Sequence, residues 1–234
     1  MLKKVFATAV LSVSALGTMA ASANIYDPTI SGPVSGPYIT GQFGYANTHM
    51  GNKVLVEANS ALGIDHPLSL STDGPAARVG VGYQINPVLG VEFGFTQFDR
   101  KKLVVDKSDS SHHIVPVGTL SLNQNALDLL VKGSFQFPSN ISVYGKIGVA
   151  YLTTLPRWQH TEDFEGKTVP VTFDLNDFAG IAKHKIAPEA VVGVEYLLTP
   201  NVAIGGSWTH IQPFGSHRPG TVDFVSGGVS YYFG

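Results

Sequence analysis

Near its C-terminal end the chain reads TVDFVSGGVSYYF, residues 221–233. Alternate positions of this segment carry apolar side chains, namely Val225, Val229, Tyr231 and Phe233. Several of the positions between them are small or polar, namely Ser226, Gly228 and Ser230. Successive side chains of a β-strand point to opposite faces, so the segment predicts a strand with one apolar and one polar face. Such an alternation is typical of the strands of a membrane β-barrel.

The first residues have the three parts of a secretory signal peptide. Lys3 and Lys4 supply positive charge, an apolar run follows from Val5 to Leu16, and Ala21-Ser22-Ala23 is a small-x-small cleavage site. The apolar run is shorter than the about 20 residues that a spanning helix needs. A start that stays attached as an amphipathic segment fits these three parts less well. We therefore expect a cleaved signal peptide at residues 1–23, a periplasmic lead-in at 24–37 and a barrel at 38–234.

Composition limits the classes of function. Charged residues make up 14% of the chain, against about 25% in soluble domains. The net charge of −2 offers no basic surface, so we expect no nucleic-acid partner. There is no cysteine, so this exported chain has no disulfide framework.

Turn residues divide the mature chain into eight segments with the two-residue alternation. We expect strands near residues 38–47, 76–85, 88–98, 122–137, 141–152, 188–198, 202–210 and 221–233. Short turns at 86–87, 138–140 and 199–201 alternate with long loops at 49–75, 99–120, 153–187 and 211–220. Bacterial outer-membrane barrels have this asymmetry, with short periplasmic turns and long external loops. The sequence thus predicts an all-β fold: an eight-stranded antiparallel up-and-down transmembrane barrel in the outer membrane of a Gram-negative bacterium.

The two faces of these strands differ in charge. One face carries a Phe, Tyr or Trp on nearly every strand and no charge at mid-strand. The other face is rich in glycine and carries every mid-strand charge, namely Arg78, Glu92, Asp128, Lys132, Lys146, Glu189 and Glu195. Asp223 has the parity of the apolar face but lies near the loop end of its strand, where a charge costs only about 0–1 kcal/mol.

Alternation alone does not say which face points outward. In a soluble ligand-binding barrel of the lipocalin type the apolar face would point inward. An eight-stranded barrel is only just wide enough for its own side chains or one small ligand, and the many aromatic rings would overfill it. We therefore expect the apolar face to contact lipid and the charged face to line the interior.

Several strand motifs resemble the OmpA transmembrane domain. They are GYQINP at 82–87 with GVEFG at 90–94, APEA at 187–190, GVEY at 193–196 with Thr-Pro at 199–200, and GVSYYFG at 228–234. The resemblance brackets nearly the whole mature chain and is confined to the strands. It implies an outer-membrane barrel with a polar, plugged interior and a mainly structural role, in some members an adhesin or phage receptor, and at most a small pore.

The sequence departs from this family in two ways. Many members continue into a periplasmic peptidoglycan-binding domain, which does not follow Gly234 here, so tethering to the cell wall is not expected. Members also pair a glutamate matching Glu195 with a lysine matching Lys132 or with an arginine. Gly205 occupies the arginine position, so an exchange between two partners is not expected.

The seven interior charges, three cations and four acids, are nearly balanced. Unpaired ions in a narrow lumen are costly, so we expect each charge to find a partner on another strand. The set is interpreted as a structural plug, with a gate or selective pore as the alternative.

At the C-terminus, the alternation of Val229, Tyr231 and Phe233 resembles the signal that the outer-membrane assembly machinery reads. These three residues also fit a last lipid-facing strand without further function. The two interpretations can hold together.

Other polar residues give no pattern of a catalytic or metal site. The predicted loops contain His112, His113, His160, His184 and His217 without acidic or cysteine partners at ligand spacing, so solvated side chains are expected rather than a metal site. An acyl-transfer site built from His49, Asp65, Ser69 or His210 has no supporting motif. We therefore expect no enzyme and no cofactor.

The predicted function is a structural or surface-interacting role through the external loops, as an adhesin or receptor, because binding residues concentrate on loops of rigid scaffolds. A narrow passive porin is the alternative. The expected partners are outer-membrane lipid and lipopolysaccharide, the outer-membrane assembly machinery, and host-cell or phage ligands at the loops.

Overall fold

The fold is seen in a computed structural model of the chain. It describes residues 33–49, 73–99, 101–108, 114–137, 140–164, 167–174, 183–215 and 220–233, with the backbone alone for 101–122 and 156–174. In this part of the chain no helix is long and apolar enough to cross a membrane. The expected signal peptide at 1–23 lies outside the described residues, as does most of the lead-in.

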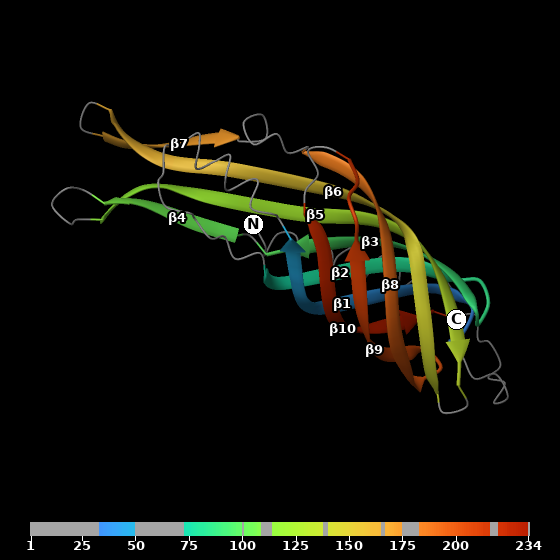
Figure 1. Cartoon of the computed structure of the whole chain (residues 1–234). Coiled ribbons are helices and arrows are strands. Elements are labelled where there is room, and N and C mark those ends of the chain that lie inside the picture. Colours follow the sequence, from blue (N-terminus) through green and yellow to red (C-terminus); the bar gives the residue numbers. More distant parts are fainter. Residues whose placement is uncertain are drawn as a thin grey trace.

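The described residues form ten antiparallel strands (Figure 1). They are β1 (Gly36–His49), β2 (Asp73–Gln84), β3 (Leu89–Phe98), β4 (Lys101–Ser108), β5 (Ile114–Gln136), β6 (Ile141–Phe164), β7 (Lys167–Asp174), β8 (His184–Thr199), β9 (Val202–Ile211) and β10 (Thr221–Tyr232).

Eight of these strands close into a barrel. Each barrel strand pairs with its neighbour in the chain, β5 pairs with β6, and β10 pairs back onto β1. The predicted eight-stranded up-and-down barrel is therefore confirmed. Closure pairs the backbone of every barrel strand on both edges, which an apolar environment requires.

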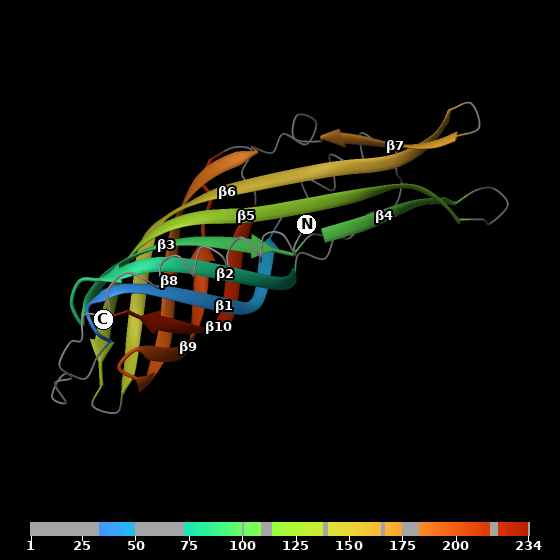
Figure 2. The ribbon, with the colours of Figure 1, turned by 180° about the vertical axis from the view of Figure 1, so that it is seen from behind.

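The two further strands correct the prediction of long loops at 99–120 and 153–187. β4 pairs with the first part of β5, and β7 pairs with the last part of β6. β5 and β6 also pair with each other beyond the barrel, and the four strands project from it as an arm (Figures 1 and 2). We call residues 101–122 and 155–174 the arm. Alternation on a lipid-facing surface could not reveal these strands, because outside the membrane no face has to be apolar.

The short connections are held by side chains that bond the backbone. Asn86 Oδ1 accepts hydrogen bonds from the amides of Val88 and Leu89, at 2.9 and 2.8 Å. Thr199 Oγ1 accepts in the same way from the amides of Asn201 and Val202. Asn140 has a φ of 59°, a left-handed conformation that asparagine tolerates better than most residues. These turns place β2–β3, β5–β6 and β8–β9 connections at one end, the turn end, opposite the arm.

The two faces of the barrel are arranged as predicted. The outer wall exposes large apolar side chains on every barrel strand, among them Phe43, Phe93, Phe135, Ile147, Val192, Trp208 and Val225. Mid-strand charges lie inside. The lipocalin-like orientation is thereby excluded, since exposed apolar side chains cover the outer face rather than line a cavity.

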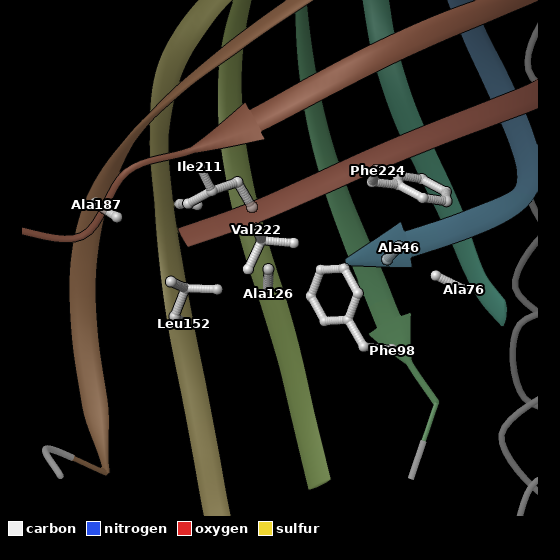
Figure 3. Packing of buried hydrophobic residues seen from close by; sticks show 10 residues of the cluster. Ala46, Ala76, Phe98, Ala126, Leu152, Ala187, Ile211, Val222 and Phe224 are labelled. Atoms are coloured by element: carbon white, nitrogen blue, oxygen red, sulfur yellow. The ribbon is translucent and has the colours of Figure 1, made fainter. Parts of the chain in front are cut away.

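The side chains that fill the barrel interior change in character along the barrel axis. At the end that carries the arm, a mainly apolar layer fills the interior (Figure 3); its members are Ala46, Ala76, Phe98, Ala126, Ala150, Leu152, Ala187, Ile211, Val222 and Phe224. A charged layer lies at mid-height, and Tyr38, Leu197, Ala203 and Tyr232 pack near the turn end. The sequence predicted an interior that is polar along its whole height, and the apolar layer corrects this expectation. Near the ends of the strands, apolar side chains point both into the barrel and outward.

Candidate functional site: the charged layer inside the barrel

All seven predicted interior charges point into the barrel, and none has more than 7% of its surface exposed. They come from five strands: Arg78 on β2, Glu92 on β3, Asp128 and Lys132 on β5, Lys146 on β6, and Glu189 and Glu195 on β8. The alternation of each strand points these side chains inward, and the small circumference of the barrel brings them together.

Arg78 joins two acids from different strands. Its Nη1 donates to Glu92 Oε1 at 2.6 Å. Its Nη2 and Nε donate to the two oxygens of Asp128, at 2.6 and 3.2 Å. Arg78 reaches Asp128 across β3 at the position of Gly94, where an added Cβ would collide with Arg78 Nη2 and Asp128 Oδ1. Glycine is therefore required here by space.

Glu92 accepts hydrogen bonds from three side chains. Besides Arg78, Lys146 Nζ lies 2.8 and 2.7 Å from its two oxygens, and the Tyr38 hydroxyl donates to Oε2 at 2.7 Å. Arg78 and Lys146 thus share Glu92 and Asp128, a set of two positive and two negative charges.

Lys132 and Glu195 form a second ion pair. Lys132 Nζ lies 2.8 and 3.0 Å from the two Glu195 oxygens and 3.2 Å from the Tyr232 hydroxyl. The ammonium also lies 4.8 Å from the ring centre of Tyr144, within the range of a cation–π contact. The structure has the pair that the OmpA resemblance implies. Gly205, at the position of the alternative arginine, is the register partner of Glu195 and offers no second cation.

Glu189 is the exception. It is 4% exposed, and its Oε2 has no hydrogen-bond partner. The charged groups that act on it are Asp128, Arg78, Lys146 and Glu92. Among the described interior charges it is the acid without an ion-pair partner within 4 Å, contrary to the expectation that each charge is paired.

Sequence reasoning did not single out the interior tyrosines as site residues. Tyr38, Tyr144 and Tyr232 are nearly fully buried and surround Lys132 with their rings. They have the inward parity of their strands, which was the available signal. Their contacts span strands far apart in sequence, so parity alone could not show that they share one cation.

A separate polar group lies on the outer wall near the arm end. Asp223 Oδ1 lies 2.8 Å from His210 Nδ1, and Asp223 Oδ2 lies 3.5 Å from His49 Nδ1. Two imidazoles, from β1 and β9, therefore lie beside the Asp223 carboxylate on the apolar face. Asp65 and Ser69, the other members of the imagined acyl-transfer site, lie outside the described residues.

Of the five predicted loop histidines, the structure describes the side chain of His184. His184 stacks on Tyr151 with ring centres 5.3 Å apart and lies 3.2 Å from Thr153 Oγ1. His112, His113 and His217 lie outside the described residues, and for His160 only the backbone is described. Within the described part of the chain, no group of three His, Cys, Asp or Glu side chains is placed to hold a metal ion.

The C-terminal motif lies at the turn end of β10 on the outer wall. Val229 and Tyr231 are exposed, and the rings of Tyr231 and Phe233 meet edge to face at 4.8 Å. The Phe233 amide donates to the carbonyl of Pro37 at 2.9 Å, so the strand is joined to β1 up to its end. If these residues form an assembly signal, it therefore acts before β10 pairs with β1 and the barrel closes.

Residues 7–233 match the sequence model of the family described as "Outer membrane protein beta-barrel domain". The chain belongs to this family. The protein is accordingly located in the outer membrane, and the exposed apolar wall contacts its lipid.

Individual relatives are distant. An uncharacterized protein of Coxiella burnetii is 25% identical over 215 residues, covering 85% of this chain and 86% of that protein. Neisserial surface protein A is similar with 19% identity and a TM-score of 0.46, over 85% of this chain and 97% of that one. OprG from Pseudomonas aeruginosa has 12% identity and a TM-score of 0.47, over 87% and 99%.

Proposed function

We propose that this protein is a closed outer-membrane barrel that holds its arm outside the membrane for binding to an external partner. One observation supports this proposal most: the barrel interior is filled by charged and apolar layers, while β5 and β6 continue beyond the barrel and carry β4 and β7 with them. Among the described residues, the part that extends beyond the barrel and is open to interaction is therefore the arm.

The filled interior weighs against the alternative of a narrow porin. A pore needs a continuous water path past Arg78, Lys132 and Lys146, and all three are almost fully buried with their ammonium or guanidinium groups bonded to acids. Above them, Phe98 and Phe224 belong to the apolar layer. A solute would have to displace both layers.

The dimensions of the arm favour binding outside the membrane. The last pairs of β5 with β3 and of β6 with β8 are Asn125 with Gln97 and Thr153 with His184. Beyond them β5 runs on to Ile114, which at about 3.3 Å per residue extends the sheet by roughly 36 Å. Such a sheet presents both faces and the outer edges of β4 and β7, and extended segments of partners commonly bind at strand edges.

Deletion of the arm tests this proposal. Removing residues 101–121 and 156–181 should leave the barrel ladders intact, because the Thr154 amide can still donate to the Lys183 carbonyl at the new junction. Attachment of expressing bacteria to host cells, or adsorption of phage, should then fall to the background of cells without the protein. The deletion variant should still migrate as a folded, heat-modifiable barrel.

A control deletion of residues 54–68, between β1 and β2, should leave attachment unchanged. Attachment that survives loss of the arm, with the barrel folded, would contradict the proposal. Equal loss of attachment in the control would assign binding to another loop.

A further inference from the structure

Among the described side chains, the charges inside the barrel divide into neutral sets with one acid left over. Arg78 and Lys146 are bonded to Glu92 and Asp128, and Lys132 is bonded to Glu195. These six residues sum to zero. Glu189 is the seventh interior charge, and an ionised Glu189 would give the layer a net charge of −1.

The described register neighbours of Glu189 carry no charge. Its register neighbours are Gly148 on β6 and Ile211 on β9. Ala187, two residues before Glu189 on β8, and Ile211 both belong to the apolar layer (Figure 3). Glu189 therefore lies where the charged layer meets the apolar layer.

The charged groups near Glu189 are already engaged. Asp128 on β5 and Glu92 on β3 have its own sign, while Arg78 on β2 and Lys146 on β6 have the opposite sign. Both cations donate to other carboxylates at 2.6–2.8 Å. A buried ion without its own partner is strongly unfavourable, and a carboxyl group in that position takes up a proton instead.

We propose that Glu189 is a proton-binding site of the folded barrel, so that its side chain is the neutral acid at neutral pH and the whole charged layer is neutral. A metal ion fits this position less well. Hard cations take six or more oxygen ligands, and the oxygens of the nearby Asp128 both accept from Arg78. A proton needs no further ligand.

This site links the plug to pH. Above the pH at which a free glutamate ionises, the folded barrel keeps a proton that the unfolded chain has lost. Unfolding then releases a proton, so stability falls as pH rises until the folded barrel loses its proton as well. Once ionised, Glu189 competes with Glu92 and Asp128 for Arg78 and Lys146, and the plug loosens. The proton site does not depend on what the arm binds.

Three matched substitutions test the proposal: Glu189→Gln, Glu92→Gln and Glu195→Gln in the refolded mature chain. Glu189→Gln replaces a neutral acid by a neutral amide of the same shape. Its denaturant midpoint should equal or exceed that of the wild type at neutral pH, and the decline of the midpoint with rising pH should weaken. Glu92→Gln and Glu195→Gln each leave a buried cation without its carboxylate partner. The denaturant midpoints of these two variants should therefore drop clearly.

Infrared spectroscopy gives a second measurement that requires no comparison of stabilities. The wild-type barrel at neutral pH should show the carbonyl stretch of a protonated carboxylic acid, and Glu189→Gln should lose it. The proposal is overturned if that band is absent from the wild type, if Glu189→Gln lowers the midpoint as much as Glu195→Gln, or if sodium, potassium or calcium ions raise the wild-type midpoint and not that of Glu189→Gln.

Discussion

Glu92 occupies the centre of the charged layer. Its two oxygens receive hydrogen bonds from Arg78, Lys146 and Tyr38, which come from three other strands. Burying an ion is tolerable only when its hydrogen-bonding capacity is satisfied by well-placed partners. At the scale of single residues, the interior is therefore stable because each cation is matched by acids that reach it across the barrel.

Gly94 allows one of these contacts to form, because the Arg78 guanidinium passes over it to Asp128. We predict that Gly94→Ala lowers the free energy of unfolding by about 1–3 kcal/mol, the usual cost of overpacking a filled interior. Urea unfolding of the refolded barrel measures this change.

Gly133→Ala on β5 is the matched control, since an added Cβ there meets nothing within 4 Å. It should change stability by no more than about 0.5 kcal/mol. Equal effects of the two substitutions would show that space at Gly94 is not what admits the ion pair.

At the same scale, sequence could place each charge but not join it to its partner. The alternation of side chains along each strand assigned Lys146 and Glu92 to the interior. Their strands are separated by β5, however, and the contact between the two side chains crosses the lumen. Such contacts depend on the barrel's closure and diameter. Glu189 shows the limit most clearly, since its lack of a partner follows only from where Arg78 and Lys146 point.

At the scale of elements, β10 has one observed role and one predicted role in its last residues at the turn end. Tyr232 points inward, where its hydroxyl accepts from Lys132 Nζ and donates to Glu195 Oε2, whereas Tyr231 and Phe233 point outward. Truncation before Tyr231 would remove both roles at once. Outward substitutions separate them, because they leave the interior contacts in place.

We predict that the double substitution Tyr231→Ala and Phe233→Ala reduces the amount of folded, heat-modifiable barrel that accumulates in the outer membrane. This expectation rests on the prediction that the assembly machinery reads these side chains before β10 pairs with β1. Val225→Ala, also outward on β10 and 61% exposed, should accumulate normally. Normal accumulation of the double variant would rule out the signal.

The barrel strands could be predicted from sequence because lipid forces every one of them to show an apolar face. Trp208 and Val192, for example, lie on the outer wall as the alternation required. The arm strands β4 and β7 are under no such constraint, and their segments were expected to be loops. Their pairing follows from the continuation of the β5–β6 ladder, which no local pattern specifies.

At the scale of the whole molecule, the protein combines a filled barrel with a sheet that projects from it (Figure 1). The apolar wall fixes it in the outer membrane, and the charged and apolar layers occupy the barrel interior. In the proposed function, binding at the arm takes the place of transport through the barrel. This division of roles depends on the lumen being closed.

Conductance of the purified, refolded chain in planar bilayers measures that closure. We predict no steady current through the wild-type barrel, and intermittent channel openings in Glu195→Gln, because the substitution leaves Lys132 without its acid. A steady wild-type current that is unchanged in Glu195→Gln would contradict the closed lumen and make the protein a porin.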